Sequence, residues 1–319
     1  MVLDVKNLSV GMGTKDNQKL ILNQIDFTVK RGETIAIVGE SGCGKSMTAL
    51  TVMGLLPEPV VRVVSGEILL QGKNLTTISQ REMDKVRGKD VAMIFQEPMT
   101  ALNPSFTIGN QLGEIFRLHF NLNADETRKK CIEILKRVKI PDPEAKLKAY
   151  PHQLSGGMRQ RVVIAMALAC NPKVIIADEP TTALDVTIQA QILELLVELQ
   201  LQFDTTVILI THDLGVVAQT CHRAIVMYAG QIVEEGTVEE LFEHPQHPYT
   251  KGLMDSIPRL DGTRGKLHVI KGSVPDLEAM PQGCRFNPRC EYATDTCRKD
   301  APELEITSDG RRVRCWNKL

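Results

Sequence analysis

A glycine-rich segment at residues 39–46, GESGCGKS, constrains this chain more than any other part of it. It follows a short apolar run at 34–38 and precedes an apolar, helix-forming run at 47–56. Glycine lets the backbone wrap closely around a phosphate, and the N–H groups at the start of a helix point towards the anion. The lysine adds a positive charge near the β- and γ-phosphates, and the serine hydroxyl can bind Mg²⁺. The pattern therefore predicts a nucleotide-binding loop formed by Gly39, Ser41, Gly42, Cys43, Gly44, Lys45 and Ser46.

Two adjacent acidic residues end a second apolar run. Residues 174–177 read VIIA and are followed by Asp178 and Glu179. Two such acids alone more often mark the solvated end of a strand. With a phosphate loop upstream, we expect Asp178 to hold Mg²⁺ and Glu179 to act as the general base on the attacking water.

Two further polar residues follow apolar runs. Gln96 comes directly after the run at 91–95, and its side-chain amide could contact Mg²⁺ and the attacking water. His212 comes after the run at 207–210 and could reach a γ-phosphate, although a histidine at a strand end is more often structural. The predicted catalytic residues are thus Glu179 and His212, with Mg²⁺ held by Ser46, Gln96 and Asp178.

Composition and charge limit what the chain can be. Of its 319 residues, 43% are hydrophobic and 24% are charged, a balance typical of folded globular proteins. The net charge of −1 gives no overall attraction to nucleic acid. The sequence has no apolar run of about 18 residues or more, and its N-terminus lacks a signal-peptide pattern. We therefore expect a cytosolic protein that acts at a membrane only through partners.

The order of the patterns predicts an α/β fold. Strand patterns fill most of the first 95 residues, helix-period segments occupy about 98–169, and strand patterns return between 174 and 233. A helical insertion inside one α/β domain explains this order, because the strands on both sides carry complementary parts of one site. We place a boundary near residue 240, which divides a domain at 1–240 from a C-terminal extension at 241–319.

The run LSGGM at 154–158 adds the motif that makes the set recognisable. It resembles the signature motif of ABC ATPases. The other motifs of that family are matched in order by 39–46, Gln96, 174–179, ALD at 183–185 and His212. The resemblance implies an ATP-hydrolysing enzyme with the ABC nucleotide-binding fold, in which a RecA-like P-loop core carries an antiparallel β subdomain and a helical subdomain.

In that family two cassettes stack head to tail, and the signature of one subunit completes the nucleotide site of the other. The resemblance therefore adds Ser155, Gly156, Gly157 and Asp185 to the predicted ATP-binding residues. The fifth signature residue is commonly glutamine, but Met158 stands here. Met12 occupies the position where the family usually stacks an aromatic ring on adenine, which leaves the base selectivity open.

Four of the eight cysteines lie in the last 36 positions, where the sequence has little apolar periodicity and needs another means of stabilisation. They are Cys284, Cys290, Cys297 and Cys315. Disulfides are disfavoured in the cytosol, and the gaps are longer than those of usual Cys₄ zinc sites. A [4Fe–4S] cluster also takes four thiolates, which the flanking Arg285, Arg289, Arg298 and Arg314 would stabilise. Chemistry alone leaves iron–sulfur, zinc and no metal open.

Several stretches resemble one subgroup of the family more closely. They are QEPMTALNP at 96–104, HPQHPYT at 244–250, GC at 283–284 and NPRC at 287–290. They are similar to ATPase subunits of dipeptide and oligopeptide importers, and most to the D-type subunit of dipeptide importers. Some members carry a [4Fe–4S] cluster in this region, so the resemblance predicts one here, with zinc as the alternative. His244 and His247 could pair on a metal, but the proline after each favours a structural turn.

The resemblance implies the subunit that energises a peptide importer from the cytoplasmic face of the membrane. Its partners would be a second ATPase, identical or different, two membrane permeases and, indirectly, an extracytoplasmic solute-binding protein. We expect no nucleic-acid partner. Importers of nickel or glutathione use similar subunits and stay as alternatives for the solute. A soluble ABC ATPase that acts on nucleic acid or ribosomes is disfavoured, because the sequence has one cassette and no sustained heptads.

Overall fold

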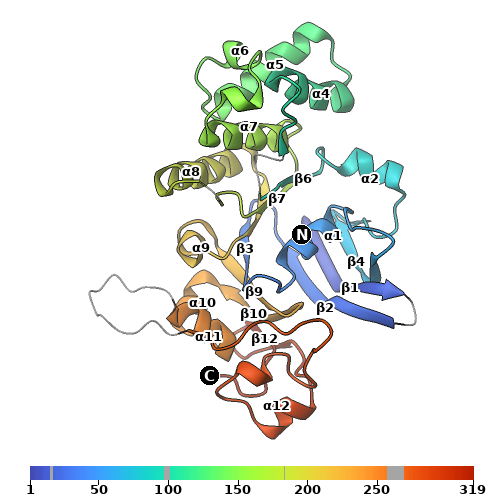
Figure 1. Ribbon diagram of the computed structural model, residues 1–319, viewed down its shortest axis with the longest axis vertical. Helices are drawn as coiled ribbons and strands as arrows, with labels where there is room; N and C mark the ends of the chain where they lie inside the picture. Colours follow the sequence, from blue (N-terminus) through green and yellow to red (C-terminus); the bar gives the residue numbers. More distant parts are fainter. Residues whose placement is uncertain (15–16, 97–100, 183, 257–268) are drawn as a thin grey trace. The chain divides into compact units, whose positions relative to one another are not determined.

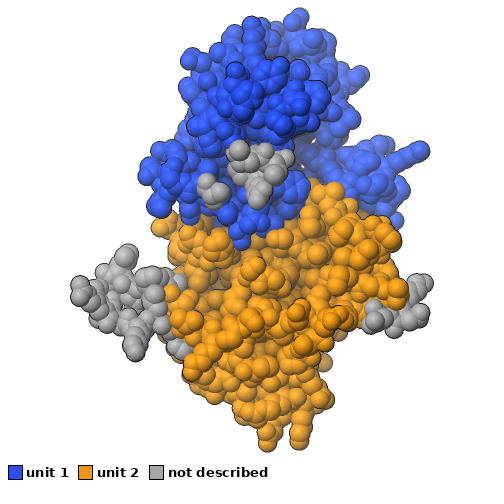
Figure 2. Space-filling view, in the orientation of Figure 1, with its two compact units in different colours: residues 1–2, 29–33, 77–209 blue, residues 3–28, 34–76, 210–319 orange. Residues whose placement is uncertain are grey.

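The computed structural model describes residues 1–14, 17–96, 101–182, 184–256 and 269–319. The chain divides into two compact units (Figure 2). Unit 1 comprises residues 1–2, 29–33 and 77–209, and unit 2 comprises residues 3–28, 34–76 and 210–319. In the described part of the chain, no helix is both long and apolar enough to cross a membrane.

Unit 2 contains an antiparallel sheet with the strand order β2-β1-β4-β5. The strands are β1 (Leu3–Thr14), β2 (Asn17–Val29), β4 (Val61–Leu70) and β5 (Lys73–Asn74). The sequence predicted that the first strand would break at residues 11–13, but β1 runs on to Thr14. It can do so because Gly13 adopts a φ of +104° and its carbonyl accepts a bond from Arg62 Nη1 at 3.0 Å.

Unit 2 also contains a mixed sheet with the strand order β11-β12-β10-β9-β3. Strands β3 and β9 run parallel, and every residue of β3 is buried, as the apolar run after Thr34 predicts. Helix α1 (Lys45–Val52) follows β3 after the glycine-rich segment, and α9 (Leu214–Thr220) precedes β9. The strands are β3 (Thr34–Val38), β9 (Arg223–Tyr228), β10 (Gln231–Thr237), β11 (Glu305–Ile306) and β12 (Arg312–Val313).

Unit 1 combines neighbouring strands with a group of helices. The strands follow the order β8-β7-β6, and β6 and β7 run parallel. Four helices, α4 to α7, contact one another and lie together in the unit (green in Figure 1). The bounds are α2 (Gln80–Val86), β6 (Val91–Ile94), α4 (Ile108–Phe120), α5 (Ala124–Arg137), α6 (Pro143–Lys146), α7 (Gly156–Leu168), β7 (Val174–Asp178) and β8 (Thr206–Ile210).

Helix α8 (Val186–Phe203) has 18 residues and was not predicted from the sequence. Its start carries a clear signal, because Asp185 caps the helix by accepting the N–H of Ile188 at 2.9 Å. Most of its leucines also recur at helical spacing and are buried, namely Leu193, Leu195, Leu196 and Leu199. Helix α5 starts with a capping box, in which the side chains of Asn123 and Glu126 each accept the backbone N–H of the other residue.

The residues after β10, called here the C-terminal extension, belong to unit 2 together with the strands that precede them. Its strand β12 pairs with β10, so the extension adds to the mixed sheet. Its helical elements are α10 (Val238–Glu243), α11 (Pro248–Asp255), a 3₁₀ turn (Asn287–Arg289) and α12 (Asp295–Lys299).

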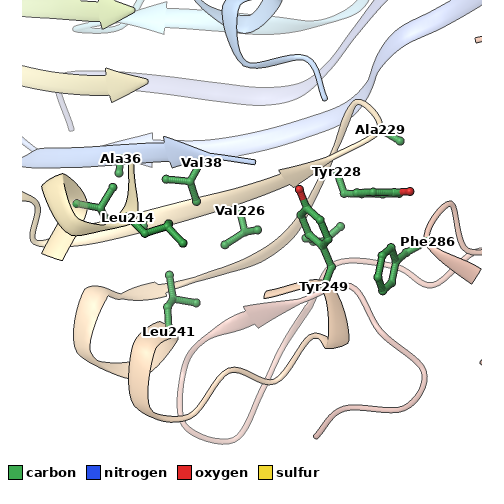
Figure 3. Close-up of a cluster of buried hydrophobic side chains, with 12 residues drawn as sticks. Ala36, Val38, Leu214, Val226, Tyr228, Ala229, Leu241, Tyr249 and Phe286 are labelled. Carbon is green, nitrogen blue, oxygen red and sulfur yellow. The ribbon is translucent and has the colours of Figure 1, made fainter. Parts of the chain in front are cut away.

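The extension shares the hydrophobic core of the mixed sheet. Tyr249 of α11 and Phe286 are buried with Val226 and Tyr228 of β9 (Figure 3). The rings of Tyr228, Tyr249 and Phe286 meet edge to face, with centroids 4.7, 5.1 and 5.3 Å apart. The segment is therefore stabilised by apolar contacts with the strands that come before it in the chain.

His247 caps α11 and makes the stability of this core depend on pH. Its Nδ1 accepts the N–H of Tyr249 at 3.0 Å, which requires a neutral ring, and burial lowers its pKa from 6.5 to about 3. The unfolded chain takes up a proton below pH 6.5, whereas the folded ring stays neutral. The free energy of unfolding should therefore fall as the pH drops from 6.5 towards 3, by at most about 1.4 kcal/mol per pH unit from this group.

His247→Asn is expected to remove this part of the pH dependence, because asparagine can still cap a helix but does not titrate. Urea unfolding at several pH values between 7 and 4 would measure it, with the difference between wild type and variant as the readout. The free energy of unfolding of the variant, relative to that of wild type, should rise steadily as the pH falls from 6.5 to 4. A constant difference would contradict the assignment.

Candidate functional site

The segment 39–46 forms a loop between β3 and α1 whose shape requires glycine. Gly39 has a φ of +149°, and a Cβ there would lie 2.3 Å from the carbonyl oxygen of Met227. Gly44 has a φ of +105°, and a Cβ there would lie 2.7 Å from a side chain of β2. A Cβ on Gly42 would meet nothing within 4 Å. The loop thus packs tightly against the unit on one side and is open at Gly42.

Lys45 folds back against the start of the loop. Its Nζ donates to the carbonyl oxygen of Gly39 at 2.7 Å and to that of Glu40 at 3.1 Å. Only 6% of the residue is exposed. The ammonium group therefore fixes the first two residues of the loop and keeps its positive charge there.

Cys43 faces inward, and its thiol is fully buried. Burial raises the pKa of this thiol, and the nearby Lys45 offsets only part of that rise. The backbone carbonyl of Cys43 accepts the N–H of Gly230 at 2.8 Å, which ties the loop to the turn between β9 and β10. The side chain of Cys43 therefore has a packing role.

The loop fits a phosphate chain with Mg²⁺. Ser41, Gly42 and Ser46 are exposed, so the hydroxyl of Ser46 is available as the kind of hard oxygen ligand that Mg²⁺ takes. In the described structure no side chain caps α1, as suits a helix whose N-terminus receives an anion.

Two other predicted residues lie in unit 2. His212 is exposed and follows Thr211, whose N–H donates to the carbonyl of Ile37 in β3 at 3.4 Å. This bond holds the segment with His212 beside the strand that leads into the loop. Met12 is half-buried on β1, where it pairs with Val61 of β4.

Unit 1 brings the predicted base and the predicted glutamine together. Glu179 follows the buried Asp178 at the end of β7 and has a φ of +46°, a left-handed conformation that is uncommon for a residue with a side chain. Its Oε2 accepts bonds from Gln96 Nε2 and from Thr182 Oγ1, each at 3.0 Å. Thr182 is a contact that the sequence analysis did not name. The carboxylate of Glu179 is thus held in a defined orientation.

The signature segment starts α7. Ser155 caps this helix by accepting the N–H of Met158 at 3.3 Å. A Cβ on Gly157 would lie 2.8 Å from Cγ2 of Ile188, because α8 packs directly against this turn. Asp185 caps α8 on that same residue, so the starts of α7 and α8 are fixed side by side. The cap Ser155 and the first helical residue Gly156 are exposed, and Gly157 is half-buried. Residues 97–100 and Ala183, which belong to two of the predicted motifs, lie outside the described residues.

The prediction of a [4Fe–4S] cluster at Cys284, Cys290, Cys297 and Cys315 is wrong. All four cysteines are described, and the described residues contain no group of three or more His, Cys, Asp or Glu side chains that could hold a metal ion. Cys284 and Cys290 pack against the hydrophobic core of unit 2, and Cys297 Sγ lies 3.3 Å from Thr294 Oγ1. Burial raises the pKa of the Cys315 thiol to about 12, which disfavours the thiolate that a cluster needs. The same observations leave the zinc alternative without support.

The four arginines that were expected to stabilise thiolates donate hydrogen bonds to carbonyl and carboxylate oxygens. Their partners are the carbonyl of Ala229 for Arg285, Glu40 for Arg289, Asp295 for Arg298 and the carbonyl of Ile232 for Arg314. The charge of Arg314 does favour the Cys284 thiolate, but burial outweighs it and raises the pKa of that thiol.

Unit 2 contains a strand, a glycine-rich loop and a helix with the buried Lys45. Unit 1 contains a strand followed by Glu179, whose carboxylate is hydrogen-bonded. These are the features of a P-loop ATPase. A family model described as ABC transporter matches residues 22–182. A second model, described as the C-terminal region of oligopeptide/dipeptide transporters, matches residues 233–297.

Relatives cover nearly the whole chain. It is 53% identical to the dipeptide transport ATP-binding protein DppD of Bacillus subtilis, over 99% of this chain and 94% of that protein. It is 51% identical to the oligopeptide transport ATP-binding protein AppD of the same organism, over 99% of this chain and 96% of that protein. Among solved structures, it resembles the dimeric ATP-binding cassette MJ0796 bound to ADP and Pi, with a TM-score of 0.65 and 28% identity over 74% of this chain and 98% of that chain.

The chain belongs to the ABC transporter family, as the ATP-hydrolysing subunit of a dipeptide or oligopeptide importer. The fold is that of the ABC nucleotide-binding domain. Its substrate is ATP with Mg²⁺, and family membership implies permease partners and dimerisation.

Gly39→Ala should raise the Kd for Mg·ATP at least about tenfold, because a Cβ cannot lie 2.3 Å from the carbonyl oxygen of Met227 and the loop must shift. Gly72→Ala is the matched control, since residue 72 also has a positive φ, +85°, but a Cβ there meets nothing within 4 Å. The control should carry about 1–2 kcal/mol of backbone strain and leave the Kd unchanged. Calorimetric titration would measure both, and equal Kd values in the two variants would contradict the loop assignment.

Proposed function

We propose that this chain binds Mg·ATP at the loop 39–46 and hydrolyses it when a second ATPase subunit closes over that loop. The observation that carries the proposal is the carboxylate of Glu179, whose Oε2 is held at 3.0 Å by both Gln96 and Thr182. A carboxylate in a fixed orientation at a strand end is suited to take a proton from a water molecule.

In the proposed reaction, water attacks the γ-phosphorus of ATP and Glu179 takes one proton from that water. The bond between the γ-phosphorus and the oxygen that bridges to the β-phosphate breaks, and ADP and inorganic phosphate are released. Lys45 and the backbone of the loop hold the phosphates, and His212 contacts the γ-phosphate. Such catalysis consists mainly of positioning and of stabilising charge.

Ser46, Gln96 and Asp178 are the proposed Mg²⁺ ligands. They offer a hydroxyl, an amide and a carboxylate oxygen, which are the hard donors that Mg²⁺ prefers. When bound, Mg²⁺ neutralises charge on the β- and γ-phosphates. Met12 is the proposed contact for the adenine base.

The signature residues Ser155, Gly156 and Gly157 are proposed to act on the nucleotide of the partner subunit. The exposure of Ser155 and Gly156 supports this, because a helix N-terminus with small residues can approach an anion closely. The related cassette MJ0796 is a dimer bound to ADP and Pi, which supports the same arrangement here. Asp185, packed beside that turn, is assigned to the same interface. The partner is a second copy of this chain or a homologous ATPase.

We place the subunit on the cytoplasmic face of the membrane, bound to two permeases that are fed by an extracytoplasmic solute-binding protein. Di- and oligopeptides are the proposed solutes, in line with the transport activities for which the relatives are named. We also propose a cassette at 1–240, with its helical subdomain at about 98–169, and an extension at 241–319. The change from β10 to α10 at Val238 supports this boundary.

Glu179→Gln should keep the Kd for Mg·ATP within about threefold of wild type but lower the rate of hydrolysis by about 10²–10⁴-fold, because glutamine retains the shape but cannot accept the proton. Phosphate release by the assembled transporter would measure the rate. Glu198→Gln is the matched control, since Glu198 is an exposed carboxylate of the same unit paired with Lys139. Hydrolysis at the control rate in Glu179→Gln would refute the assignment.

A further inference from the structure

Glu40, the first variable residue of the phosphate loop, is held at three points. Its carbonyl accepts the bond from Lys45 described above. Its backbone N–H donates to Tyr249 Oη at 2.9 Å, and its carboxylate pairs with Arg289. Tyr249 and Arg289 both come from the C-terminal extension, 209 and 249 residues further along the chain. The chemistry of ATP hydrolysis does not account for these two contacts.

The pair of Glu40 and Arg289 is bidentate and largely shielded from water. Nη1 of the arginine donates to Oε2 at 2.9 Å, and Nη2 donates to Oε1 at 3.0 Å. The side chain of Arg289 is 6% exposed and that of Glu40 is 29% exposed. Two parallel bonds from a planar guanidinium fix the direction of the carboxylate as well as its distance.

Arg289 is itself held in place by the extension. Its Nε donates to the carbonyl of Lys271 at 2.8 Å, and Nη2 faces two further carbonyls within 270–272 at 3.3 and 3.4 Å. Its guanidinium carbon lies 5.6 Å from the ring centroid of Tyr228. The arginine is therefore preorganised to hold Glu40.

Tyr249 is anchored in the buried ring cluster. Its ring meets those of Tyr228 and Phe286 edge to face, with centroids 4.7 and 5.3 Å away (Figure 3). The residue is fully buried, and its hydroxyl accepts the N–H of Glu40 in the loop. This hydrogen bond ties the backbone of Glu40 to the hydrophobic core of unit 2.

We infer that Arg289 and Tyr249 are positioning residues for the phosphate loop, and that the C-terminal extension thereby sets the affinity of this cassette for Mg·ATP. The inference rests on the proposed binding of Mg·ATP at 39–46. Arg289 fixes the first turn of the loop, and its charge offsets that of Glu40. Without this offset, a carboxylate inside the loop would repel the phosphates of ATP. Such repulsion is weakened by salt and abolished by neutralising Glu40, whereas a purely structural defect is not.

The test uses the full-length chain with Arg289→Gln, Glu40→Gln, and both together, and measures the Kd for Mg·ATP by calorimetry. Arg289→Gln should raise the Kd about tenfold at low ionic strength, and the loss should shrink at about 0.5 M salt. The double variant should return to within about threefold of wild type, because no negative charge is left in the loop. Arg289→Lys, which keeps the charge but not the bidentate geometry, should lie between wild type and Arg289→Gln.

Arg298→Gln is the matched control, because it breaks an exposed ion pair with Asp295 in α12 of the same extension. It should bind Mg·ATP as wild type does. If wild type and this control bind but Arg289→Gln has an unchanged Kd, or a loss that neither salt nor Glu40→Gln relieves, the inference is wrong and the proposed function stands. If wild type itself does not bind Mg·ATP, the proposed function fails. If Arg289→Gln does not fold, Arg289→Lys and the double variant decide between the same outcomes.

Discussion

The bonds from the Lys45 ammonium to the carbonyls of Gly39 and Glu40 are the interaction on which the rest of the structure depends. They close the loop on itself and keep a buried positive charge at its start, where phosphate oxygens are proposed to bind. A buried cation needs polar partners, so the loop is restricted to shapes that bring both carbonyls to the Lys45 ammonium. The observed shape in turn requires glycine at Gly39, where β9 leaves no room for a side chain. The strands of unit 2 thus determine the conformation of the eight-residue loop 39–46.

The C-terminal extension also contacts this loop, through Arg289 and Tyr249. It shares the ring cluster of β9, pairs a strand with β10, and holds Glu40 from outside the cassette's own loop. The proposed base, Glu179, is held by Gln96 within unit 1, where the starts of α7 and α8 are also packed against each other. Each unit therefore holds one group of the proposed site residues in a defined arrangement. A motor that opens and closes over ATP needs defined arrangements of this kind, since a ligand can shift the balance between two states only through contacts that differ between them.

Sequence patterns predicted the loop, the strand before it and the role proposed for Glu179, because these features depend on neighbours in the chain. The contact of Glu179 with Gln96 was foreseen only as a shared site, and the structure adds its geometry. Helix α8 carried an N-cap and helical spacing and could have been predicted. The pairing of Arg289 with Glu40 could not, since nothing local relates residues 249 positions apart. The prediction from the four C-terminal cysteines failed because burial, which depends on the whole fold, raises the pKa of the Cys284 and Cys315 thiols.

Hydrogen exchange of the full-length wild-type chain, with and without a non-hydrolysable Mg·ATP analogue, tests the central claim most directly. The account predicts that the analogue slows exchange at residues 39–46 and, through Glu40, also at the amides around Tyr249 and Arg289. Slowed exchange in the loop alone would contradict the coupling to the extension. Unchanged exchange throughout 39–46, in a sample shown to hold the nucleotide, would contradict the account as a whole.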